Sequence, residues 1–246
     1  MPLSFPQQFW RALHDWWREQ SRERSVASTA SLLLHNLGTF VRESTPEQRR
    51  QRYGDMEYDW ENRVDTTSGT VGWRVRLLGL FHSPYQPTEP ALFREMMASL
   101  PIEFDQFTFV DLGSGKGRTL LMASEYPFRK IIGVELLPAL HQIAQDNLAK
   151  YKSKSQKCFA LETICDDAAD FLFPVEPLVL YLFNPLPESG LTRVMANLER
   201  SLSAHPRAVY ALYHNPLLER VLSSSVALTR TGGTPQYSVY AFRGNG

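Results

Sequence analysis

The sequence predicts an α/β fold, a doubly wound and mostly parallel sheet with helices on both faces. From residue 107 onward, apolar runs of strand length alternate with stretches of helical periodicity. A glycine-rich turn follows the first run, as in β-turn-α-β units that hold an adenosine-containing ligand at their strand ends. The preceding residues carry helical periodicity of their own. We therefore expect an N-terminal helical extension with a lid or substrate loop (1–84) and an α/β domain (85–246).

Seven segments have the length and apolar composition of strands. They are residues 107–110, 130–134, 159–165, 178–183, 208–213, 226–229 and 237–242. The last two flank Gly232-Gly233-Thr234-Pro235, so we expect them to form a hairpin that closes the sheet. Helical stretches separate the others, and the strongest of these places Leu191, Val194 and Leu198 on one face.

The N-terminal part is predicted to begin with two helices. Aromatic and apolar residues fall on one face of the first: Phe9, Leu13, Trp16 and Trp17. This face fits packing against protein, although aromatic residues beside arginines also suit a membrane surface. Apolar residues repeat at helical spacing from Val26 to Val41, and Ser44-Thr45-Pro46-Glu47 is a helix-start signal.

The stretch from Gly54 to Gly72 is polar and predicts a loop, either a lid that includes Tyr58 and Asp65-Thr66 or an ordinary linker. Thr88 is expected to cap a further helix that ends before Pro101.

The composition excludes several classes of protein. The 246 residues carry 26 basic and 26 acidic side chains, so there is no footprint of a general nucleic-acid binder, although a local basic patch stays possible. Cys158 and Cys165 lack metal spacing and are predicted to be buried small apolar residues. No apolar run reaches the roughly 18 residues of a membrane span, and no secretory signal is visible. We expect a cytoplasmic protein.

The turn Asp111-Leu112-Gly113-Ser114-Gly115-Lys116-Gly117 discriminates between cofactors. A dinucleotide site favours GxGxxG, whereas here the third glycine comes one residue early. A carboxylate at Asp111 would repel a pyrophosphate but would pair with an amino group. S-adenosylmethionine carries such a group in its methionyl part. Lys116 is expected to be solvated at the start of the following helix.

VDLGSGKGRTLL resembles motif I of the class I S-adenosylmethionine-dependent methyltransferases, and IIGVE resembles their second-strand motif. DLGSG is also similar to a loop of the seven-stranded histone lysine methyltransferases, and DLGSGKGR to a group of bacterial proteins with little assigned function. The resemblance implies a seven-stranded sheet whose last strand is antiparallel. It assigns the methionyl part to the turn, in residues Asp111, Gly113, Ser114, Gly115 and Gly117.

The same resemblance assigns the rest of the cofactor. Glu135 would accept the ribose hydroxyls, and Asp167 would accept the adenine amino group, with Asp166 as the alternative. One of these two aspartates is expected to cap the following helix instead. His82, Tyr85 and Thr88 precede motif I, where the family often places residues that cover the cofactor.

Methyl transfer requires alignment and sometimes a base, and it needs no metal. Asn184-Pro185 follows the fourth strand and resembles the Asn/Asp-Pro-Pro-aromatic motif of amino-group methyltransferases, although Leu186 and Pro187 depart from it. An ordinary strand-ending turn is the alternative. His214 follows the fifth strand and is either a general base or a structural histidine. The spacing of the other histidines, His14, His35, His141 and His205, suggests no metal site.

We therefore expect an S-adenosylmethionine-dependent methyltransferase with Asn184, Pro185 and His214 at its catalytic site. The acceptor is unidentified, and a nitrogen on a protein or small molecule is favoured. Two alternatives stay open: a non-catalytic module of this fold that holds a partner, and a nucleotide-dependent oxidoreductase.

Overall fold

The computed structural model describes residues 5–43, 56–81 and 85–242. These residues form two compact units. The first comprises Met1–Glu61 and Thr67–Gln86, and the second comprises Asn62–Thr66 and Pro87–Gly246. The five residues 62–66 therefore pack with the second unit, although they come from the N-terminal part of the chain. The division into 1–84 and 85–246 stays a prediction.

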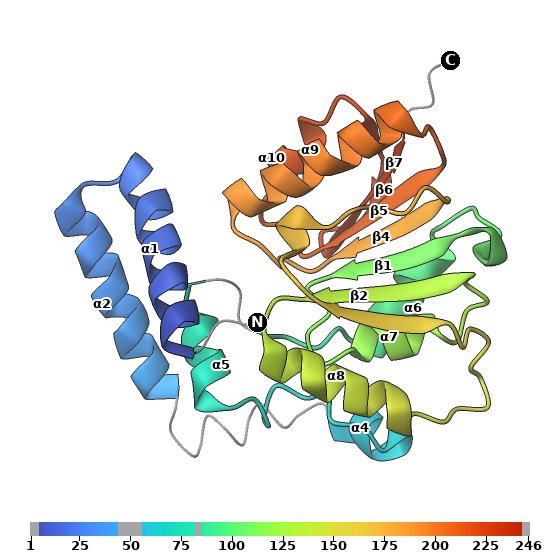
Figure 1. The fold of residues 1–246 in the computed structure, drawn as a ribbon, viewed down its shortest axis with the longest axis horizontal. Helices are drawn as coiled ribbons and strands as arrows, with labels where there is room; N and C mark the ends of the chain where they lie inside the picture. Colours follow the sequence, from blue (N-terminus) through green and yellow to red (C-terminus); the bar gives the residue numbers. More distant parts are fainter. Residues whose placement is uncertain (1–4, 44–55, 82–84, 243–246) are drawn as a thin grey trace. The chain divides into compact units, whose positions relative to one another are not determined.

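The second unit is built on a seven-stranded sheet in the order β3-β2-β1-β4-β5-β7-β6 (Figure 1). The strands are β1 Thr108–Leu112, β2 Lys130–Glu135, β3 Leu161–Cys165, β4 Leu178–Leu182, β5 Val209–His214, β6 Leu228–Gly233 and β7 Tyr237–Phe242. Neighbouring strands from β3 to β5 are parallel, and β7 is antiparallel to both β5 and β6. The predicted fold class, including the antiparallel last strand and the closing hairpin, is confirmed.

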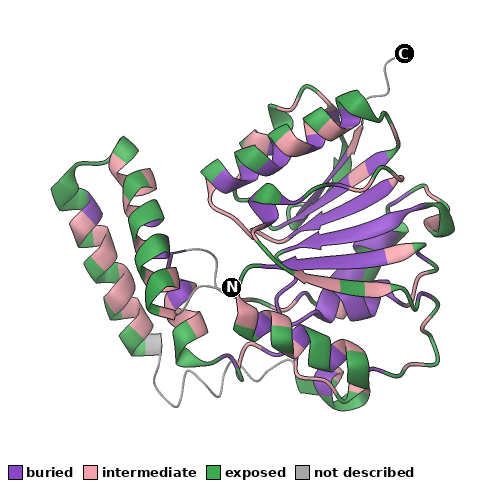
Figure 2. Ribbon diagram, in the orientation of Figure 1, coloured by how far each residue is buried: buried purple, intermediate pink, exposed green. Residues whose placement is uncertain are grey.

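Helices cover both faces of this sheet, as predicted (Figure 1). The helices of this unit are α6 Pro90–Ala98, α7 Arg118–Ala123, α8 Pro138–Lys150, α9 Glu188–Ala204 and α10 Glu219–Ser223, with single 3-10 turns at Phe104–Gln106 and Ala168–Asp170. Side chains alternate along each strand, so one face of β1 presents Val110 to the core that includes α9, and the other presents Phe109 to Phe93 of α6. The central strands are buried on both faces (Figure 2).

The predicted cap of α6 is wrong. Glu89 occupies the N-cap position, because Pro90 takes the first helical position and thereby fixes where the helix begins. The hydroxyl of Thr88 instead lies 2.7 Å from that of Tyr181 and is buried. This contact belongs to the site described below.

The first unit contains α1 Phe5–Glu23, α2 Val26–Glu43, α4 Met56–Asn62 and α5 Trp73–Leu78. The aromatic face of α1 packs within this unit, with Phe9 and Trp16 both in edge contact with Phe81. On α2, by contrast, apolar side chains of the predicted stripe are exposed, among them Val26, Leu34 and Val41. The predicted helix start at Ser44–Glu47 lies outside the described residues. Within the described residues, no helix is long and apolar enough to cross a membrane.

The prediction of a continuous loop over residues 54–72 is wrong, because α4 occupies part of it. Two acidic residues in its first turn, Glu57 and Asp59, stabilise the helix through the helix dipole. Asp59 also accepts a hydrogen bond from the backbone N–H of Thr67 at 2.9 Å, which fastens the following segment.

Candidate functional site

The glycine turn after β1 lies against the turn after β4. Gly113, Gly115 and Gly117 all have positive φ, at 86°, 54° and 83°, a region that glycine adopts without a steric penalty. A Cβ atom on Gly113 would lie 2.5 Å from Cβ of Pro185. The parallel register of β1 with β4 brings the two turns to one edge of the sheet.

Asp111 places a buried carboxylate directly below the glycine turn. Its side chain is 1% exposed, and its Oδ2 atom has no hydrogen-bond partner among the residues that the structure describes. Burial raises the pKa of Asp111 to about 7; a hydrogen bond with Thr119 lowers it and the charge of Glu135 raises it further. An unsatisfied buried carboxylate is costly, so this site favours a ligand that brings a donor or a positive charge.

Glu135 holds the glycine turn from the end of β2. Its Oε2 accepts the N–H of Gly115 at 2.9 Å, and its Oε1 accepts the N–H of Leu137 at 2.8 Å. Burial raises the pKa of Glu135 to about 6, against the lowering effect of these hydrogen bonds. Each carboxylate oxygen retains a further lone pair for a ligand hydroxyl.

Ser114 contributes a second unsatisfied polar atom to the turn. Its Oγ is buried and has no partner within the described parts of the chain. A Cβ on Gly133 of β2 would lie 2.8 Å from this Oγ, so the absence of a side chain on β2 makes room for Ser114. Polar groups without partners thus gather around the turn.

Of the two aspartates after β3, Asp167 is the one that caps the following 3-10 turn. Its Oδ1 accepts the N–H of Ala169 at 2.9 Å, while the exposed Asp166 accepts the N–H of Asp167 at 2.8 Å. The expectation that both cysteines are buried is wrong for Cys165, which is exposed because β3 is an edge strand. Cys158 is buried.

A chain of buried hydrogen bonds joins Thr88, Tyr181 and His214. The Tyr181 hydroxyl lies 2.7 Å from Oγ1 of Thr88 and 2.8 Å from Nδ1 of His214. Burial lowers the pKa of His214 to about 4 and raises that of Tyr181 well above its ordinary value. His214 is therefore neutral at pH 7. Phe183 stacks on its ring, with the ring centroids 3.8 Å apart.

The two Asn-Pro turns that follow β4 and β5 are tied together. Asn184 Nδ2 donates to the carbonyl of Asn215 at 2.6 Å, and the hydroxyl of Tyr213 donates to Asn184 Oδ1 at 2.9 Å. Both asparagines have positive φ, 45° at Asn184 and 47° at Asn215. The amide of Asn184 is thereby oriented, and its Oδ1 keeps one lone pair.

Lys116 is buried, so the expectation of a solvated side chain is wrong. Its side chain has no exposed area, and its Nζ donates to Asp65 Oδ1 at 2.8 Å. Arg118, 1% exposed, donates from Nε to Thr66 Oγ1 at 2.6 Å. Asn147 of α8 accepts from the N–H of Asp65 and donates to the carbonyls of Asp65 and Lys116, at 2.8, 2.8 and 2.9 Å. Segment 62–66 is thus fastened to the cofactor turn.

Sequence reasoning missed Tyr181, Tyr213 and Phe183. Tyr181 and Tyr213 lie inside apolar strand segments and were counted as core. Their one available signal is their position, because each lies in the last residues of a strand whose carboxyl end carries an Asn-Pro turn. His82 lies outside the described residues. No cluster of three or more histidine, cysteine or acidic side chains suited to a metal occurs in the described ranges.

Comparisons with known proteins agree with this architecture. A family model described as "Histone methylation protein DOT1" matches residues 82–165, the part that holds the glycine turn, Glu135 and the end of β3. The comparison with curated proteins found no match.

Three solved structures illustrate the similar proteins. A predicted N6-adenine-specific DNA methylase from Listeria monocytogenes is 16% identical over 64% of this chain, with a TM-score of 0.47, and the match spans about half of that protein, 52%. A precorrin-6y C5,15-methyltransferase from Geobacter metallireducens is 14% identical over 63% of this chain and 90% of its own, with a TM-score of 0.47. An RNA methyltransferase from Salinibacter ruber, in complex with S-adenosyl-L-homocysteine, is 19% identical over 63% of this chain and 92% of its own, with a TM-score of 0.38.

Proposed function

We propose that this chain, which has the class I S-adenosylmethionine-dependent methyltransferase fold, transfers a methyl group from S-adenosylmethionine to a nitrogen of a protein or small molecule. The observation that carries the proposal is the buried carboxylate of Asp111. It lies under a glycine turn at the carboxyl edge of the sheet, and its Oδ2 has no partner among the described residues. A ligand ammonium would satisfy it.

The residues of the turn fit S-adenosylmethionine better than a dinucleotide. Asp111 and the turn from Gly113 to Gly117 would hold the methionyl part, with Ser114 Oγ free to bond a carboxylate oxygen. A pyrophosphate would be placed near two buried acids, Asp111 and Glu135, which disfavours the oxidoreductase alternative.

The adenosine part would extend along the ends of β2 and β3. Glu135 would accept the ribose hydroxyls through the lone pairs that its backbone hydrogen bonds leave. Asp167 is half-buried and uses Oδ1 to cap the 3-10 turn, which leaves Oδ2 for the adenine amino group. Thr88 would act through Tyr181 rather than by direct contact.

When bound, S-adenosylmethionine supplies an electrophilic methyl group on a sulfonium. Asn184 would accept an N–H of the acceptor at the remaining lone pair of Oδ1, because Tyr213 and Asn215 fix the amide. Pro185 fixes the turn against Gly113 and offers its backbone carbonyl beside it. An oriented N–H acceptor favours nitrogen over oxygen as the methylated atom.

His214 would take up the proton released by the acceptor. In the tautomer whose Nδ1 donates to Tyr181, the Tyr181 hydroxyl donates to Thr88, and Nε2 then carries the lone pair of a base. Its pKa of about 4 keeps the ring neutral at pH 7 and makes it a weak base. Such a base suits an acceptor whose proton leaves after the methyl group has arrived.

Calorimetric titration and turnover test this proposal together. We expect S-adenosylmethionine and S-adenosylhomocysteine to bind and to raise the melting temperature, and NAD to have no effect. Tritium transfer from labelled S-adenosylmethionine into fractionated cell extract should then label a protein or small amine. Asn184→Ala should abolish labelling while cofactor binding persists. Cofactor binding without transfer in any fraction would favour the non-catalytic alternative, and stabilisation by NAD alone would contradict the proposal.

A further inference from the structure

Lysine is rare in this chain and is concentrated in one loop. Of the 26 basic residues six are lysines, and four of these lie within eight residues: Lys150, Lys152, Lys154 and Lys157. All four are exposed. No carboxylate lies within ion-pair distance of any of them in the described parts of the chain. The zero net charge of the whole chain therefore conceals a local excess of positive charge.

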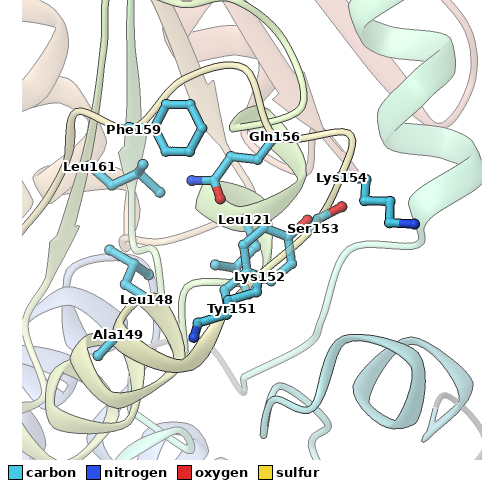
Figure 3. Close-up of a pocket in the computed structure, with 10 residues that line it drawn as sticks. All are labelled: Leu121, Leu148, Ala149, Tyr151, Lys152, Ser153, Lys154, Gln156, Phe159 and Leu161. Atoms are coloured by element: carbon cyan, nitrogen blue, oxygen red, sulfur yellow. The ribbon is translucent and has the colours of Figure 1, made fainter.

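This loop borders a pocket of about 700 Å³. Leu121 of α7, Leu148 of α8 and Leu161 of β3 supply apolar surface, and Lys152, Gln156 and Phe159 come from the loop itself. Figure 3 shows Phe159, Leu161 and Leu148 along one side, with the Gln156 amide directed toward them; the Lys154 ammonium points away from the others. The volume lies within the range of small-molecule sites, roughly 300–1,000 Å³.

The loop is held in place by contacts that leave its lysines free. Glu125 accepts from the hydroxyls of Tyr151 at 3.3 Å and Ser155 at 2.9 Å. The backbone N–H groups of Lys157 and Cys158 both donate to the carbonyl of Ser124, at 2.7 and 2.9 Å. The nearby acids are thus engaged elsewhere, since Glu162 pairs with Lys130 at 2.5 Å.

Phe159 gives the pocket an aromatic face turned to solvent. It is 77% exposed, although the residues on both sides of the loop are anchored to the domain. An exposed aromatic ring beside unpaired ammonium groups is the combination that binds single-stranded nucleic acid, because bases stack on the ring and phosphates pair with the lysines.

We propose that the pocket beside residues 150–159 binds single-stranded nucleic acid, with one base against Phe159 and successive phosphates along the four lysines. Four cations along one loop match a chain of phosphates better than a single anionic group. The pocket borders the amino end of β3, whereas the proposed methyl-transfer site lies at the carboxyl ends of the strands. The proposal therefore does not depend on the proposed function.

Fluorescence anisotropy with a labelled 12-nucleotide oligouridine tests this proposal. The wild-type chain should bind it, and the triple variant Lys152→Gln/Lys154→Gln/Lys157→Gln should bind more than tenfold more weakly. The slope of log affinity against log salt should fall in magnitude by about 2, since each lost phosphate contact on a single strand contributes about 0.7. The matched control is Arg18→Gln/Arg22→Gln/Arg42→Gln, which removes the same charge from exposed positions of α1 and α2.

Phe159 separates stacking from charge. Phe159→Leu keeps an apolar side chain and should weaken binding about tenfold, whereas Phe159→Trp should retain it. Urea unfolding of each variant checks the fold, which an exposed side chain should not disturb. Four results would overturn the proposal: no binding by the wild type at about 0.1 M salt, an equal loss in the arginine control, no effect of Phe159→Leu, or competition by polyglutamate that equals oligouridine at matched charge.

Discussion

The ammonium of Lys116, a residue of the glycine turn, lies fully buried 2.8 Å from Oδ1 of Asp65, which comes from the segment 62–66. The two partners differ in environment, because the carboxylate of Asp65 is 46% exposed. Removing either one therefore has a different consequence. The carboxylate stays hydrated without Lys116, whereas the ammonium stays buried without Asp65.

We predict that Asp65→Ala destabilises the protein more than Lys116→Met does. Loss of the carboxylate beside a buried ammonium should lower the free energy of unfolding by about 1–3 kcal/mol. The apolar replacement of Lys116 removes the buried charge and should cost less than that. Urea unfolding at pH 7 measures both values. An equal or reversed order would mean that the ammonium does not depend on Asp65.

Asp111→Asn should stabilise the ligand-free protein at pH 8. The pKa of Asp111 is raised from 3.8 to about 7, so the folded protein binds a proton that the unfolded chain releases between these pH values. Stability then falls as pH rises from about 4 to 7, and the charged form costs on the order of 4 kcal/mol above pH 7. Urea unfolding at pH 5 and pH 8 should show a wild-type loss that the variant lacks. Asp146→Asn, at an exposed position of α8, is the control.

His214 should stay neutral throughout the physiological range. Burial lowers its pKa to about 4, so its imidazole proton resonances should not shift between pH 5.5 and 8. Because the unfolded histidine binds a proton below about pH 6.5, this residue favours the folded state above that pH and disfavours it as pH falls toward 4. Proton NMR of the wild type, with His214→Gln for assignment, provides the measurement. A titration midpoint near 6.5 would contradict the burial seen here.

Gly113→Ala should impair both folding and cofactor binding. The residue has φ of 86°, and the added Cβ would lie 2.5 Å from Cβ of Pro185, so the two turns must separate. We expect a loss of at least about 2 kcal/mol of stability. Gly72→Ala is the matched control, since nothing lies within 4 Å of its Cβ position and its φ is −62°. Thermal unfolding of the two variants with and without S-adenosylhomocysteine gives the comparison; similar melting temperatures would show that the turns do not require a glycine here.

The sheet was predictable because its signals are local. Apolar runs, the glycine turn and the hairpin at Gly232-Gly233 each determine structure within a few residues, so the strands and their order of use follow from the chain. Asp111 and Glu135 were found for the same reason, since each directly follows or ends an apolar strand segment.

The contacts that sequence reasoning missed are all long-range. Lys116 was expected in solvent because nothing near it in sequence carries a negative charge; Asp65 lies 51 residues earlier. The partners of Asn184 and Tyr181 come from β5 and from Thr88, which only the folded sheet brings together. The helix α4 was missed because its polar composition resembles a loop, and tertiary contacts of Asp59 stabilise it.

The affinity for S-adenosylmethionine of the wild type and of Asp111→Asn, measured by titration calorimetry at pH 6 and pH 8, tests the central claim most directly. If the buried carboxylate of Asp111 pairs with the methionyl ammonium, wild-type affinity at pH 8 should exceed that at pH 6 by roughly tenfold, because the group with pKa of about 7 is mostly protonated at pH 6. In Asp111→Asn the affinity should be at least about tenfold lower at pH 8 and nearly independent of pH. Equal affinities of the two proteins at pH 8 would contradict the assignment of Asp111 to the cofactor.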